Sequence, residues 1–209
     1  MSVTISGDGT LTGISVGGLP DGVVDADTLA TDSVTAAKLK SDAIAAGDLP
    51  AGSVLQVKHS HLADPFTASA NETFIDITDL SVTLTTIGAS STFLVQVNLG
   101  MAKPKGNTCC FRVLRGSTAV GIADADGSRL RAGFRTTDYG FNDDHGVTAS
   151  HAFIDSPGES AGTSLTYKLQ GMNESTGNIY INRNINYGNG GESHRAVTLS
   201  SIIVTEIAA

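Results

Sequence analysis

The hydrophobic positions in the first part of the chain recur with a period of five residues. Eight aliphatic residues fall on this period: Leu19, Val24, Leu29, Val34, Leu39, Ile44, Leu49 and Val54. Helices and half-buried strands have periods of about 3.6 and 2, so the pattern fits neither element. One aliphatic residue in five cannot bury a core within one chain. The repeat therefore predicts packing against stacked neighbours or partner chains.

Two architectures satisfy this five-residue repeat. Three parallel chains can place their aliphatic residues on a shared axis, or one chain can coil into a solenoid with these residues facing inward. Solenoids of this type usually carry Ala two positions before the central Leu, whereas this chain mostly has Asp there, at Asp27, Asp32 and Asp42. We therefore favour a thin trimeric stalk over residues 19–53 and keep the solenoid as the alternative.

Residues 1–18 are rich in glycine, with Leu11, Ile14 and Val16 spaced between the glycines. Such a segment predicts short extended structure with tight turns and little stability of its own. We expect it either to order on a docking partner or to be a disordered terminus.

From Val54 onward the hydrophobic residues alternate with polar ones. Alternating runs cover residues 80–85, 93–99, 111–114, 165–169, 179–181 and 197–207. Turn-forming residues separate the runs, for example at 124–127 and 155–162. About nine or ten strands at this spacing predict an all-β domain over residues 54–209, a jelly-roll-like β-sandwich forming a knob after the stalk.

Composition and charge argue against two classes of binding partner, nucleic acids and membranes. The formal net charge is −8, which opposes binding to nucleic acid because that requires clustered Lys and Arg. No run approaches the roughly 18 apolar residues of a membrane span, so we expect no membrane insertion. The N-terminus lacks the basic start and apolar core of a secretory signal, which predicts assembly in a cytoplasm.

His59 and His61 are the sharpest candidates for a metal site. A spacing of two on a strand places both imidazoles on one face. In a trimer, three such pairs around the axis would present six nitrogens to one axial metal ion. The alternative is a pair of exposed or interface histidines, and no other cofactor is expected.

Aromatic and arginine residues in the knob are candidates for receptor contact. Tyr139, Phe141 and Tyr187 lie among Gly, Asn and Asp, as aromatic residues that stack on sugars in loops often do. Arg129 and Arg131 are the arginine candidates for receptor contact. Like Arg112, Arg115, Arg135, Arg183 and Arg195, they could form bidentate bonds to an anionic glycan. For these arginines we favour the other role, ion pairs with Asp and Glu between subunits.

The chain carries no motif that predicts catalysis. A polysaccharide hydrolase requires two carboxylates at a defined separation, and the sequence pairs none of its Asp and Glu residues. No Gly-x-Ser-x-Gly turn is present for a serine nucleophile. We therefore predict a protein that is not an enzyme.

Several segments resemble the tail-fibre or receptor-binding proteins of marine and cyanobacterial tailed phages. The resemblance is carried by Thr4-Ile-Ser-Gly-Asp-Gly-Thr-Leu-Thr-Gly, Thr31-Asp-Ser-Val-Thr-Ala-Ala-Lys-Leu and Pro50-Ala-Gly-Ser-Val-Leu-Gln-Val, and by Phe111-Arg-Val-Leu-Arg-Gly-Ser in the knob. It covers nearly the whole chain, and its N-terminal part is the more specific.

The resemblance implies a homotrimer in the virion, attached to the baseplate or tail through its N-terminus. Its knob would bind a glycan or protein on the host surface, with no fixed receptor residues to carry over. Three alternatives remain open. They are a purely structural baseplate or capsid decoration protein, a small polysaccharide-degrading hydrolase, and a cellular lectin-like or tumour-necrosis-factor-like domain.

Overall fold

The computed structural model describes residues 4–5, 7, 11–12, 24, 29–31, 33–35, 39, 44–102, 108–137, 147–185 and 196–209. The chain divides into two compact units, Met1–Ala45 and Ala46–Ala209. In the first unit, strand β1 (Thr4–Ile5) pairs antiparallel with β2 (Leu11–Thr12). Nowhere in the described residues is there a helix long and apolar enough to cross a membrane.

The residues on the five-residue period expose their side chains in the single chain. Those described in the first unit are 45–57% exposed: Val24, Leu29, Val34, Leu39 and Ile44. Leu49 and Val54 continue the series in the second unit, with 38% and 59% exposed. Leu19 lies outside the described residues. A solenoid formed by one chain would turn these side chains inward, whereas the described ones are exposed.

The second unit is built from strands, preceded by a 3-10 turn at Ala46–Asp48. Its described residues form eleven strands: β3 (Val54–Leu62), β4 (Phe66–Ser69), β5 (Ile75–Thr85), β6 (Thr92–Ala102), β7 (Thr108–Arg115), β8 (Thr118–Val120), β9 (Phe134–Thr137), β10 (Val147–Asp155), β11 (Ser164–Asn173), β12 (Asn178–Ile181) and β13 (Ser200–Ile207). The predicted all-β class is confirmed, with no α-helix among the described residues.

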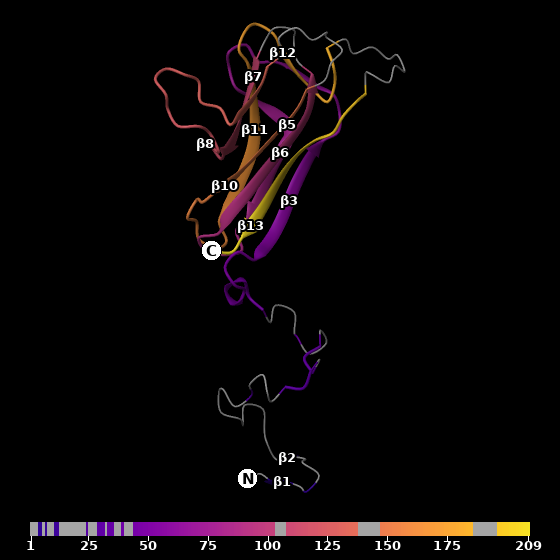
Figure 1. Ribbon diagram of the computed structural model, residues 1–209, viewed down its shortest axis with the longest axis vertical. Coiled ribbons are helices and arrows are strands. Elements are labelled where there is room, and N and C mark those ends of the chain that lie inside the picture. Colours follow the sequence, from indigo (N-terminus) through magenta and orange to yellow (C-terminus); the bar gives the residue numbers. More distant parts are fainter. Residues whose placement is uncertain are drawn as a thin grey trace. The chain divides into compact units, whose positions relative to one another are not determined.

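The strands form two sheets that pack face to face (Figure 1). The first sheet has the order β3-β13-β6-β12-β4, with β10 on the free edge of β6. The second has the order β5-β11-β7-β8, and β9 also pairs with β7. The eight principal strands pair as nested antiparallel couples, β3 with β13, β5 with β11, β6 with β10 and β7 with β9. This nesting of first with last is the connectivity of a jelly roll.

The core lies between the two sheets and follows from the alternation seen in the sequence. Each strand turns one set of alternate side chains inward, as in β6, where Phe93, Val95 and Val97 are fully buried. Tyr167 of the facing sheet lies against Phe93, with ring centroids 6.0 Å apart. The predicted runs fall within β5, β6, β7, β11, β12 and β13, although β13 begins only at Ser200.

Polar contacts join the two sheets at their edges. Ser60 of β3 donates its hydroxyl proton to the carbonyl oxygen of Asp79 on β5. At the other side, Arg115 of β7 forms an ion pair with Asp155 of β10, which also accepts a 2.8 Å hydrogen bond from the Tyr167 hydroxyl. These contacts fix the two sheets relative to each other, so the side chains on their outward faces keep fixed positions.

Candidate functional site

An open cleft of about 640 Å³ lies on the outward face of the second sheet. Its floor is formed where β11, β7 and β9 run side by side, and Met172, Cys110 and Arg135 occupy cross-strand positions there. Cys110 points outward while its neighbour Cys109 is buried, and neither forms a disulfide. The cleft thus rests on paired strands rather than on loops alone.

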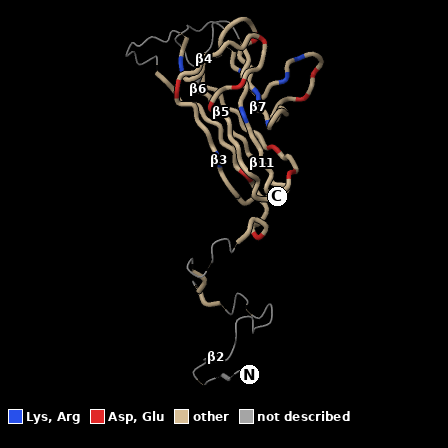
Figure 2. The backbone as a smooth tube through the Cα atoms, turned by 180° about the vertical axis from the view of Figure 1, so that it is seen from behind, with Lys and Arg blue, Asp and Glu red and all other residues tan. Residues whose placement is uncertain are grey.

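The loop between β8 and β9 forms one wall of the cleft. The Arg131 side chain donates a 2.7 Å hydrogen bond to the Ala123 carbonyl oxygen across the loop. At the end of the loop, the Gly133 N–H donates to the Phe111 carbonyl oxygen at 2.8 Å. Figure 2 shows basic and acidic residues following one another along this loop. These bonds hold a loop without regular structure against the sheet.

Gly121 fixes where this loop leaves β8. Its φ angle is +60°, and a Cβ built there would lie 2.4 Å from the ring of Phe153. Its carbonyl oxygen is 2.9 Å from the Nε2 of His151. Because only glycine tolerates both the left-handed backbone and the close ring, the wall of the cleft depends on this residue.

The opposite wall carries two glutamates. Glu174 follows β11, and one of its carboxylate oxygens accepts a 2.8 Å hydrogen bond from the Thr108 N–H. Glu72 lies in the turn before β5 with a φ of 49°, and its N–H donates to the Asn173 carbonyl oxygen at 2.9 Å. Both turns are therefore tied to the ends of the strands that form the floor.

Basic groups face these glutamates in the cleft. Arg129 pairs with Asp126 at 2.6 Å, and the side chains are 83% and 72% exposed. Within the described part of the chain, Arg135 has no ion-pair partner. Burial and the negative charge of Glu174 raise the pKa of the Cys110 thiol, and the positive charge of Arg135 opposes them. The cleft thus combines charged groups of both signs with the less polar side chains of Met172 and Cys110.

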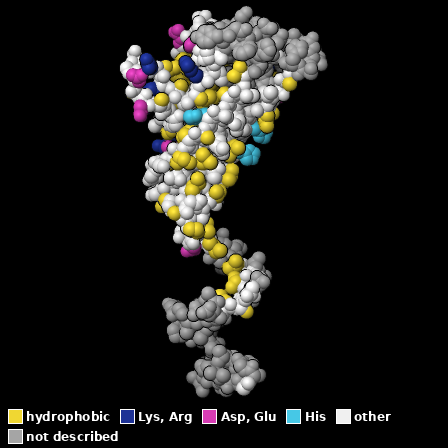
Figure 3. Space-filling view, viewed as in Figure 1, with side chains coloured by type: hydrophobic (Ala, Val, Ile, Leu, Met, Phe, Trp, Pro, Cys, Tyr) yellow, Lys and Arg dark blue, Asp and Glu magenta, His cyan; other side chains and the backbone are white. Residues whose placement is uncertain are grey.

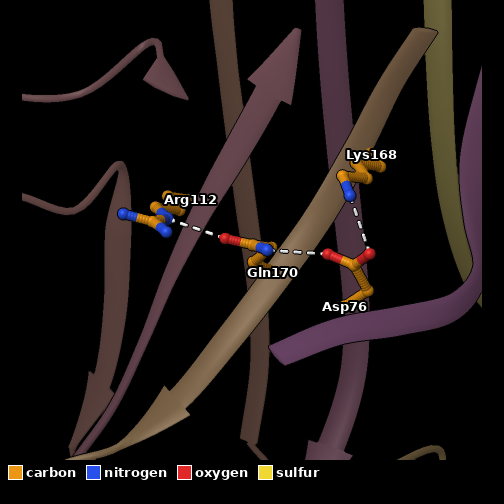
Figure 4. Close-up of polar contacts among 4 residues, drawn as sticks. All are labelled: Asp76, Arg112, Lys168 and Gln170. Atoms are coloured by element: carbon orange, nitrogen blue, oxygen red, sulfur yellow. Dashed lines mark hydrogen bonds and ion pairs between the residues drawn. The ribbon is translucent and has the colours of Figure 1, made fainter. Parts of the chain in front are cut away.

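A polar network lies beside the cleft on the same outward face (Figure 4). The Arg112 Nε–H donates to Gln170 at 2.9 Å, and the Gln170 amide donates to Asp76 at 2.7 Å. Lys168 forms an ion pair with Asp76 at 2.7 Å. Hydrogen bonds from Lys168 and Gln170 lower the pKa of Asp76 below its ordinary range. Since these groups satisfy one another, we assign the network a structural role.

The outward face of the first sheet has the opposite character. The outward-facing residues that pair across β3, β13, β6 and β10 include no Asp, Glu, Lys or Arg. These residues are Val57, His59, His61, Ser201, Ile203, Thr205, Leu94, Gln96, Asn98, Ser150, Ala152 and Ile154. Figure 3 shows hydrophobic and uncharged side chains over these strands, with charged side chains gathered towards the β8–β9 loop. Val57 and Ile154 are 53% and 56% exposed.

His59 and His61 lie on this uncharged face. Their rings are stacked with centroids 6.3 Å apart, beside a shallow groove of about 440 Å³. The described residues contain no group of three or more potential metal ligands within one chain. The axial metal site predicted for a trimer stays a prediction, because it requires histidines from three copies.

The structure places the sequence-derived receptor candidates differently. Arg129 lines the cleft, whereas Arg131 is engaged by the backbone of its own loop. Tyr139, Phe141 and Tyr187 lie outside the described residues. Arg135, one of the other arginines noted in the sequence, also lines the cleft, whereas neither glutamate was a candidate. Alternation in β9 could have indicated that Arg135 faces outward, but not which side chains stand opposite.

Comparisons with known proteins identify no family. No family model matches the chain, and no curated protein matches it. Two solved structures align with it at 13% identity and a TM-score of 0.36: the infectious bursal disease virus VP2 subviral particle and the infectious bursal disease virus Gx strain. The alignments cover 75% of this chain but only 39% and 43% of those chains.

Proposed function

We propose that this chain is a phage tail-fibre protein that acts by binding rather than by catalysis. In this proposal residues 1–18 attach to the tail or baseplate, residues 19–53 form a trimeric stalk, and the jelly-roll knob binds a receptor on the host surface. The protein would be a virion component assembled in the host cytoplasm. We further propose that the receptor on the host surface is a glycan.

The observation that carries this proposal is the exposure of the five-residue repeat. The seven described members of the repeat are 38–59% exposed in the single chain. Burying an exposed Leu, Ile or Val completely stabilises a protein by about 1.5–3 kcal/mol. Three chains that share an axis would gain part of this energy at every repeat, which supports a stalk rather than a free linker.

The uncharged face of the first sheet supports contact between the knobs. Each chain carries a net charge of −8, so copies repel one another unless they meet where charge is absent. Val54 is both a member of the repeat and the first residue of β3. A stalk that joins three chains would therefore bring three copies of β3 together, at the edge of the face without charged residues.

Binding through three knobs would compensate for a weak contact at each. Linked sites convert the second and third contacts into intramolecular events, which raises the overall affinity without new contacts. A purely structural baseplate or decoration protein would share the stalk but would not bind host cells. Binding to host cells therefore discriminates between these two functions.

Two measurements on the full-length chain test the proposal. Light scattering should give about 64 kDa, three times the 21.4 kDa of one chain. Fluorescently labelled protein should sediment with cells of at least one marine or cyanobacterial strain in a panel. A mass of one chain would contradict the trimeric stalk. A trimer that binds no strain would favour a purely structural baseplate or decoration protein.

A further inference from the structure

We infer that the cleft between the β8–β9 loop and the Glu72 and Glu174 turns binds a neutral hexose unit of a host-surface glycan. This inference rests on the proposed function and assigns its receptor contact to a place and a ligand class. Three observations support it. The cleft contains charged groups of both signs, some of its hydrogen-bonding groups have no partner among the described residues, and hydrogen bonds hold its walls in place.

The charges in the cleft favour a neutral ligand that both donates and accepts hydrogen bonds. Arg135 and Arg129 supply donors on one side, and Glu72 and Glu174 supply acceptors on the other. An anionic sugar would meet two carboxylates in a chain of net charge −8, and a cationic ligand would meet two guanidinium groups. A sugar hydroxyl group can bond to both kinds of group without placing a charge beside a like charge.

Free bonding capacity remains on both sides of the cleft. Among the described residues Arg135 has no ion-pair partner, so its planar fork of N–H donors can reach two neighbouring hydroxyl oxygens. Glu174 uses one oxygen on the Thr108 N–H, and its second oxygen has no donor within the described residues. These two residues lie close enough to Cys110 for their charges to act on its thiol in opposite directions.

The floor and one wall match the apolar side of a pyranose ring. Met172 and Cys110 form the apolar part of the floor beside Arg135, and Leu130 in the loop is 54% exposed. The C–H groups of a hexose can pack on these side chains while the hydroxyl groups bond to the rim. A cleft of about 640 Å³ lies within the size range of small-molecule sites, about 300–1,000 Å³.

The walls are held in place before a ligand arrives. Bonds from Arg131 and Gly133 fix the loop, and Asn173 fixes the turn of Glu72. The Asn71 side chain accepts a 2.7 Å hydrogen bond from the Gly177 N–H and supports the same turn. Because little ordering is left to occur on binding, a small ligand retains more of its contact energy.

The test uses the full-length chain and a panel of soluble neutral, uronic-acid and sulfated oligosaccharides. Binding is measured by calorimetry with monovalent sugars, so that avidity does not contribute. We expect at least one neutral hexose oligosaccharide to bind with little dependence on salt. Arg135→Ala and Glu72→Ala should each weaken binding by about ten-fold, as expected for loss of a charge-assisted hydrogen bond. Lys58→Ala removes an exposed cation from β3 of the other sheet and should leave binding unchanged.

Each other outcome overturns the inference in a recognisable way. Binding only to acidic sugars, with strong weakening by salt, would exclude a neutral ligand. Equal binding by Arg135→Ala, Glu72→Ala and the wild type would place the receptor contact elsewhere on the knob. Release of new reducing ends would show a hydrolase. If the wild type sediments with host cells but binds no neutral sugar, the cleft assignment fails while the proposed function stands.

Discussion

Glu206 at the end of β13 is a carboxylate inside the knob, with no exposed surface. One of its oxygens accepts hydrogen bonds from the backbone N–H groups of Ile87 and Gly88, at 2.8 and 2.9 Å. The other accepts a bond from the Gln56 side chain. This residue therefore ties the last strand to the turn between β5 and β6, and to β3 at the edge of the first sheet.

The hydrogen bonds to Glu206 predict loss of stability in acid. Burial raises the pKa of this carboxyl, but the hydrogen bonds from Gln56, Gly88 and Ile87 outweigh it, and the pKa lies below its ordinary value of 4.5. The unfolded chain therefore binds a proton more readily than the folded chain. The stabilisation is complete above pH 4.5 and is lost as pH falls through the lower, folded-state value.

Glu206→Gln tests this role by urea unfolding at pH 7 and pH 3. The amide oxygen could keep the bonds from Ile87 and Gly88, but the NH₂ group would then face the Gln56 NH₂ donor and the charge would be lost, so we expect a loss of about 1.5–3 kcal/mol at pH 7. At pH 3 the difference from the wild type should shrink. Asp64→Asn, a change at an exposed carboxylate, is the control. A difference that does not depend on pH would show that the charge of Glu206 contributes nothing.

At the scale of elements, the β8–β9 loop depends on its first glycine. Gly121→Ala would add a Cβ 2.4 Å from the Phe153 ring at a φ of +60°. Gly127→Ala is a matched control, because its φ is +57° but no atom lies within 4 Å of the added carbon. We expect the control to cost about 1 kcal/mol and Gly121→Ala roughly 1–3 kcal/mol more.

Amide hydrogen exchange of the loop provides the second measurement for this pair of variants. In Gly121→Ala the loop should move away from the sheet, so the Gly133 N–H, bonded to Phe111, should exchange faster. The same amide should remain protected in Gly127→Ala. Equal destabilisation and equal exchange in both variants would mean that the contact with Phe153 does not position the loop.

The strands that the sequence predicted are those with large alternating side chains. Leu80, Val82 and Leu84 of β5 are an example, because alternation directly records which face is buried. β10 was not predicted, since its inward positions include small Ala149 and polar His151. The cleft could not be predicted because pairing across strands brings Met172, Cys110 and Arg135 together from distant parts of the sequence.

At the scale of the whole molecule, the stalk is tested by charge on its proposed axis. Leu29, Leu39 and Leu49 changed together to Asp should dissociate the trimer in light scattering, because burying unpaired charges is costly. Ala37→Asp with Gly47→Asp is the control, since other repeats already carry Asp27, Asp32 and Asp42 at that position. A triple variant that stays trimeric would exclude an axis through the aliphatic positions.

The uncharged sheet face predicts a second contact between copies. Val57 is 53% exposed on β3, so Val57→Asp should be tolerated by a single knob but should raise the concentration at which the trimer dissociates. Ser81→Asp is the control on the other sheet, where Lys168 is its cross-strand partner. If the trimers of both variants dissociate at the same concentration as the wild-type trimer, the knobs do not meet through this face.

The pairing of β3 with β13 sets the timing of folding. These strands lie near the two ends of the knob sequence, so β3 cannot complete its ladder until Ser200–Ile207 has been synthesised. Sheets dominated by such distant pairings fold slowly, because the loop entropy is lost before the contacts form. Residues 19–53 leave the ribosome long before that strand. Nascent chains on neighbouring ribosomes would therefore have time to associate through the repeat while their knobs are still unfolded.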